Sequence, residues 1–76
     1  MSDRGRKLRG LSGERVVRAF ERVGYKVGRV RGSHYVLTHP ERAALSIPRH
    51  RELKIGLLMS KIKAAGLTVE EFEHLL

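Results

Sequence analysis

The chain has 76 residues, of which 41% are hydrophobic, and this length excludes a second domain and allows only a thin core. Sixteen Lys and Arg against eight Asp and Glu give a net charge of +8, which favours a polyanion such as nucleic acid as the partner. The absence of cysteine excludes disulfides and thiolate zinc sites.

The first nine residues have no hydrophobic period and are rich in positive charge. We therefore expect residues 1–9 to form a flexible basic arm and residues 10–76 to form one domain. No segment approaches the roughly 18 apolar residues of a membrane-spanning helix, and no signal peptide is visible. These features, together with the lack of cysteine, predict a cytoplasmic protein that does not bind membranes.

A first amphipathic helix is predicted over Gly13–Val23. Its apolar positions recur at helical spacing, at Val16, Val17, Phe20 and Val23. Ser12 is a suitable N-cap, and Gly24 can adopt the left-handed conformation that ends a helix.

Three antiparallel strands are predicted next, over Tyr25–Arg31, His34–His39 and Ala43–Ile47. A two-residue turn, Gly32-Ser33, would join the first two, with the glycine supplying a positive φ. Under strict alternation, neither face of the hairpin is cleanly apolar, so the sequence does not decide which face packs against the core. A β-bulge near Gly28 would change the phase, since a glycine inside a strand often marks a bulge.

A second helix is predicted after a polar loop. Its apolar stripe comprises Ile55, Leu58, Met59, Ile62 and Ala65, and Gly66 closes it. Thr68 and Glu71 have the spacing of a capping box, which predicts a short third helix. The resulting fold class is α+β, in the order α-β-β-β-α-α, with a three-stranded antiparallel sheet.

His34 is the strongest candidate for chemistry. In the predicted turn it is the direct cross-strand partner of Arg31, and Arg29 lies on the same face by alternation. Histidine exchanges protons near neutral pH, whereas arginine only donates hydrogen bonds and stays charged. Such a cluster could transfer a proton beside a stabilised phosphate, although a histidine beside a turn is often only a surface or capping group.

Several other residues have two interpretations each. Ser33 could donate to a phosphate, but ordinary turn chemistry is favoured, and Tyr35 is expected to pack in the core rather than stack on a base. His50 could assist binding or be a surface histidine. Lys54, Lys61 and Lys63 could line an RNA groove or form a solvated helix face. No histidines have ligand spacing, so no metal or other cofactor is expected.

A set of short motifs is similar to the HicA toxins of bacterial toxin-antitoxin pairs, over about residues 10–76. The motifs are Gly32-Ser33-His34, His39-Pro40, Ile47-Pro48, His50, Leu53-Lys54, Gly56 and Ala65-Gly66-Leu67, with Ser12-Gly13 and Gly24-Tyr25 before them. The chain departs from the pattern at Ile55, Leu57 and Met59, where many relatives have a proline, a threonine and a basic residue.

This resemblance implies a fold similar to a double-stranded-RNA-binding domain and an endoribonuclease activity on messenger RNA. It also implies a HicB-like antitoxin that masks the active site, and it aligns the family's functional histidine with His34. The alternative is a non-catalytic RNA-binding module of the same fold. A DNA-binding protein ranks third, because no helix-turn-helix spacing is present.

Overall fold

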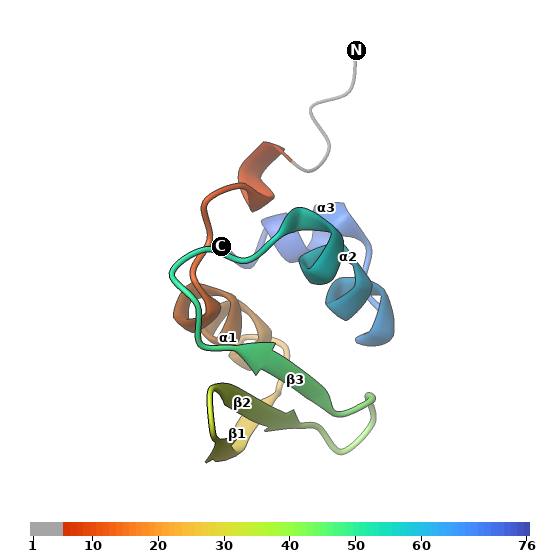
Figure 1. Cartoon of the computed structure of the whole chain (residues 1–76). Helices are drawn as coiled ribbons and strands as arrows, with labels where there is room; N and C mark the ends of the chain where they lie inside the picture. Colours follow the sequence, from red (N-terminus) through yellow and green to blue (C-terminus); the bar gives the residue numbers. More distant parts are fainter. Residues whose placement is uncertain (1–5) are drawn as a thin grey trace.

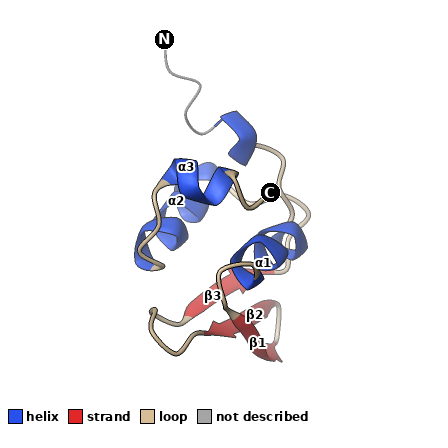
Figure 2. Cartoon of the chain, turned by 180° about the vertical axis from the view of Figure 1, so that it is seen from behind, coloured by secondary structure: helices blue, strands red, loops and turns tan. Residues whose placement is uncertain are grey.

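The computed structural model describes residues 6–76, and from helix α1 onward its element order is the predicted one (Figure 1). A 3-10 turn precedes helix α1, three strands and two further helices. Their bounds are η1 Arg6–Leu8, α1 Gly13–Glu21, β1 Lys26–Arg31, β2 His34–Thr38, β3 Leu45–Pro48, α2 Ile55–Ala64 and α3 Val69–Glu73. The strands form one antiparallel sheet in the order β1-β2-β3, and the helices gather on one side of it (Figure 2). This confirms the α+β class.

The element ends differ slightly from the expected ones. Helix α1 ends at Glu21 with Arg22 as its C-cap, and β3 begins at Leu45 rather than Ala43. The predicted N-cap is confirmed, because the Ser12 hydroxyl accepts a hydrogen bond of 3.1 Å from the backbone N–H of Arg15.

A β-bulge at Gly28 resolves which face of the sheet is the core face. Val27 pairs with Leu37 and Arg29 pairs with Val36, so Gly28 is the extra residue on β1. Since directly paired residues share a face, one side carries Val27, Val30, Tyr35, Leu37, Leu45 and Ile47. The other side carries Lys26, Arg29, Arg31, His34, Val36, Thr38 and Ser46. We call this second side the outer face.

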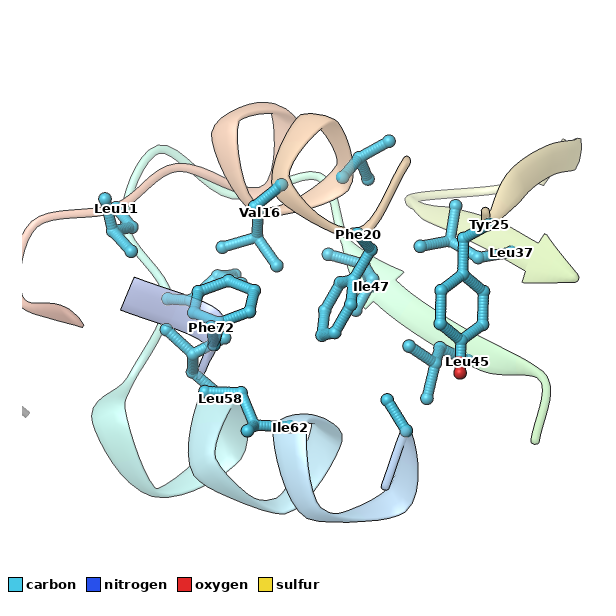
Figure 3. Packing of buried hydrophobic residues seen from close by; sticks show 14 of the residues in the cluster. Leu11, Val16, Phe20, Tyr25, Leu37, Leu45, Ile47, Leu58, Ile62 and Phe72 are labelled. Atoms are coloured by element: carbon cyan, nitrogen blue, oxygen red, sulfur yellow. The ribbon is translucent and has the colours of Figure 1, made fainter. Parts of the chain in front are cut away.

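The hydrophobic core lies between the sheet and the helices (Figure 3). Phe20 of α1 is fully buried, and its ring contacts Phe72 of α3 and Tyr25, with centroid distances of 5.0 and 5.5 Å. Leu8 is also fully buried, although the sequence assigns it to the basic arm. The predicted arm also includes η1 and Arg9, which the structure describes, whereas residues 1–5 lie outside the described residues.

The capping box at α3 makes part of the stability depend on pH. The backbone N–H of Thr68 donates to the Glu71 carboxylate at 2.8 Å, and the Glu71 N–H donates to the Thr68 hydroxyl at 3.0 Å. The hydrogen bond from the Thr68 backbone N–H to the carboxylate, followed by the contact of the carboxylate with the Thr68 side-chain hydroxyl, holds the pKa of Glu71 below its ordinary value of 4.5. A carboxyl whose pKa is lowered by folding stabilises the fold at pH values above its ordinary pKa. This stabilisation is lost as the pH falls through the pKa of the folded state.

We therefore expect Glu71→Gln to lower the melting temperature at neutral pH. The gap between wild type and variant should close as the pH falls through the pKa of the folded carboxyl, because both side chains are then uncharged. Thermal unfolding followed by circular dichroism across this range measures the gap. A gap that stays constant over the whole range would contradict the role of the Glu71 charge.

Candidate active site

The turn between β1 and β2 presents His34 to solvent. Gly32 has a φ of 59°, as the first central residue of a type II′ turn requires, so the predicted glycine role is confirmed. The backbone N–H of Arg49 donates to the Ser33 carbonyl at 2.7 Å. This bond ties the turn to the chain that leaves β3.

His34 and Arg31 are direct partners in the β1–β2 register, as expected. Arg29 lies on the same outer face, because the bulge falls before it and leaves the alternation from Arg29 to Arg31 intact. All three side chains are exposed. The structure therefore places two guanidinium groups on the same exposed face as the imidazole, and we call Arg29, Arg31, Ser33 and His34 the turn cluster.

Ser33 contacts the imidazole directly. Its hydroxyl oxygen lies 3.3 Å from Nδ1 of His34, and which group donates depends on the tautomer. A hydroxyl that donates to Nδ1 leaves the proton on Nε2, whereas a protonated ring donates from Nδ1 to the serine oxygen. In both states Ser33 helps to orient the ring, which is more than the turn role favoured from sequence.

A groove lies between the chain after β3 and the start of α1. Its volume is about 270 Å³, and its lining residues are Ser12, Glu14, Tyr35, Arg49, His50 and Arg51. We call it the loop groove. The Arg49–Ser33 hydrogen bond connects it to the turn, but its Tyr35 wall belongs to the core face, so it lies on the other side of the sheet from the His34 side chain.

The comparisons with known proteins identify the family. The model of the family described as "HicA toxin of bacterial toxin-antitoxin" matches residues 13–67. The chain belongs to the HicA toxin family. It is thus the toxin of a toxin-antitoxin system. No curated protein matches the chain in a sequence search.

The candidate RNA-binding lysines of this HicA toxin, Lys54, Lys61 and Lys63, do not all lie near the turn cluster. Lys61 and Lys63 lie in the last turn of α2, where the Arg42 guanidinium donates to the Ala65 carbonyl at 2.7 Å. Arg42 belongs to the loop after β2, at the opposite end of that strand from His34. Lys54 is exposed at the N-cap of α2, and the three remain predicted RNA contacts.

Sequence reasoning missed Arg49 and Arg51 of this HicA toxin, treating them as part of a polar loop. Both are exposed and line the loop groove. The basic run Arg49-His50-Arg51 directly after Pro48 could have indicated a binding role from sequence. Its contact with the β1–β2 turn, through the Arg49–Ser33 hydrogen bond, is visible only in the structure. Tyr35 lies on the core face, as alternation predicted, and its half-buried ring also lines the groove.

His39 of the HicA toxin connects two elements of the fold through hydrogen bonds of its ring. Its Nε2 lies 2.8 Å from the Val23 carbonyl oxygen, and its Nδ1 accepts a hydrogen bond of 2.9 Å from the Glu41 backbone N–H. These contacts join the end of β2 to the end of α1. In residues 6–76, His, Asp and Glu side chains do not gather in threes that could hold a metal ion. Every helix of this range is also too short or too polar to cross a membrane.

Proposed function

We propose that this HicA toxin is an endoribonuclease that cleaves messenger RNA by acid-base catalysis at His34, without a metal ion. The observation that supports this best is the cross-strand pair of His34 and Arg31 on an exposed, cationic sheet face. An imidazole can exchange the proton, and an arginine can hold the phosphate oxygens with paired hydrogen bonds.

RNA supplies its own nucleophile in this mechanism. A base removes the proton of the ribose 2′-hydroxyl, and the resulting oxygen attacks the adjacent phosphorus. The bond from phosphorus to the 5′-oxygen then breaks, and an acid protonates that oxygen. His34 serves one of these two steps, while Arg31 and Arg29 stabilise the negative charge that develops on the phosphate.

The other groups act in binding and regulation. Ser33 orients the imidazole through its contact with Nδ1, and Lys54, Lys61 and Lys63 attract the RNA backbone through their charge. A single acid-base group contributes about 10²- to 10⁴-fold, so the enzyme should be modest in rate. A HicB-like antitoxin in the cytoplasm, covering the exposed turn cluster, would hold the toxin inactive.

The products test the proposal. Purified toxin incubated with messenger RNA in excess chelator should yield fragments with a 2′,3′-cyclic phosphate and a 5′-hydroxyl. Mass spectrometry of the fragment ends distinguishes these groups from others. Cleavage that requires added Mg²⁺ and leaves a 3′-hydroxyl would contradict the mechanism. Stable RNA binding with no cleavage would instead favour the binding module of the same fold.

A further inference from the structure

The loop groove is a basic site that the chemistry proposed at His34 does not use. It is formed by Arg49, His50 and Arg51 on one side and by the start of α1 on the other, with Tyr35 as a wall. Its volume of about 270 Å³ is slightly below the range of about 300–1,000 Å³ typical of small-molecule sites. A single nucleotide is therefore a better match to its size than a larger ligand.

One wall of the groove is a contact between two planar groups, a guanidinium and an aromatic ring. The guanidinium carbon of Arg49 lies 5.6 Å from the centroid of the Tyr35 ring, within the range of a cation–π contact. Tyr35 is half-buried and packs against the core, whereas Arg49 is exposed. The tyrosine therefore steadies the guanidinium plane and leaves it accessible to a second planar group. Nucleic-acid bases stack on arginine planes and aromatic rings in this way.

The charges in the groove favour a phosphate as well as a base. Arg49 and Arg51 are always cationic, and the Glu14 carboxylate in the lining is paired with Arg18 at 3.2 Å. The groove thus keeps an excess of positive charge, which suits an anionic ligand. The Arg49–Ser33 backbone hydrogen bond connects the groove to the turn cluster, although the groove lies on the core side of the sheet and the His34 side chain on the outer face.

We infer that the loop groove binds one unpaired nucleotide of single-stranded RNA, in the same strand as the cleaved bond. The base stacks on the Arg49–Tyr35 pair, and Arg51 contacts the neighbouring phosphate. The link to the cleaved bond rests on the proposed nuclease function, whereas the stacking itself does not. A base in this groove must leave its helical stack, so the toxin selects unpaired RNA.

The test is an abasic scan of binding. Short single-stranded RNAs with a 5′ fluorophore are titrated with the His34→Ala chain at fixed salt, and anisotropy gives the affinity. Removing the base at one particular position should weaken binding by about 5- to 150-fold, the value of one stacked base. In the chain that also carries Arg49→Gln, this position-specific loss should disappear.

Two further variants keep the result interpretable. Arg49→Lys retains the charge but not the planar group, so it should remove the position-specific loss while keeping most of the affinity. Arg15→Gln removes the same charge from the exposed side of α1 outside the groove lining, and it should weaken all the RNAs slightly and keep the position-specific loss. Melting temperatures close to that of the parent chain show that each variant is folded.

Three results would overturn the inference. The scan could show no sensitive position, or Arg49→Gln and Arg15→Gln could weaken every RNA equally, which would indicate bulk charge alone. Arg49→Gln could also weaken binding of the HicB-like antitoxin and leave RNA binding unchanged, which would assign the groove to the protein partner. A sensitive position that depends on Arg49, in a wild-type chain that cuts no RNA, would support the groove and reject the nuclease.

Discussion

His34→Ala should reduce RNA cleavage by about 10²- to 10⁴-fold, the contribution of one acid-base group. Its affinity for RNA should change by less than about tenfold, because phosphate contacts from many basic residues dominate binding to nucleic acid. The imidazole is exposed on the outer face, so its removal leaves no cavity in the core. Initial cleavage rates and anisotropy titrations of the same preparation measure the two effects separately.

A matched control is available in His74→Ala. His74 is an exposed C-cap residue of α3, and its backbone N–H, which alanine retains, donates to the carbonyl groups of that helix. This variant should cleave RNA and arrest growth like the wild type, whereas His34→Ala should permit growth. Cleavage by His34→Ala at the wild-type rate would reject acid-base catalysis at this residue.

Gly13→Ala should have the largest effect on stability. A Cβ atom at this buried position would lie 2.0 Å from the Pro48 carbonyl oxygen, which is a backbone atom and cannot rotate away. The Gly13 N–H also donates to the His50 carbonyl at 2.9 Å, so a shift of α1 would weaken this bond. Overpacking of this kind costs about 1–3 kcal/mol or more and should lower the melting temperature by roughly 5–25 °C.

Gly56→Ala is the control for this substitution. Gly56 lies in α2, has no positive φ, and a Cβ there would meet no atom within 4 Å. Alanine favours helices over glycine by up to about 1 kcal/mol, so this variant should be as stable as the wild type or more stable. Thermal unfolding of both variants gives the comparison. Equal effects of the two substitutions would show that Pro48 does not pack against α1 in this way.

The sequence predicted the elements well because each has a local signal. Helical periodicity located α1 and α2, and the Thr68–Glu71 spacing located α3. The core face could not be chosen by alternation, because the bulge at Gly28 reverses the phase within β1. The buried position of Leu8 was missed for a similar reason, since a single leucine among basic residues carries no period.

The candidate site was predictable only in part. The pairing of Arg31 with His34 follows from a two-residue turn and needs no tertiary information. The loop groove could not be predicted, since it depends on a backbone bond between Arg49 and Ser33, which are distant in sequence. Helical periodicity likewise predicted that Lys61 lies on the solvent side of α2. It could not predict that the last turn of α2 lies near the Arg42 loop, at the far end of β2 from His34.

The extra residue at Gly28 also limits how this strand can change in length. With it, Val27 and Val30 both lie on the side of the sheet that carries Leu37, and the cations Arg29 and Arg31 lie on the outer face. Loss of that one residue would restore a regular ladder, with Val27 still opposite Leu37 and Arg29 still opposite Val36, so no side chain would change face. Loss of a residue that takes part in the pairing would instead reverse the faces of part of the strand. Gly28 is therefore the position of β1 at which we expect a single-residue change in length to be tolerated in evolution.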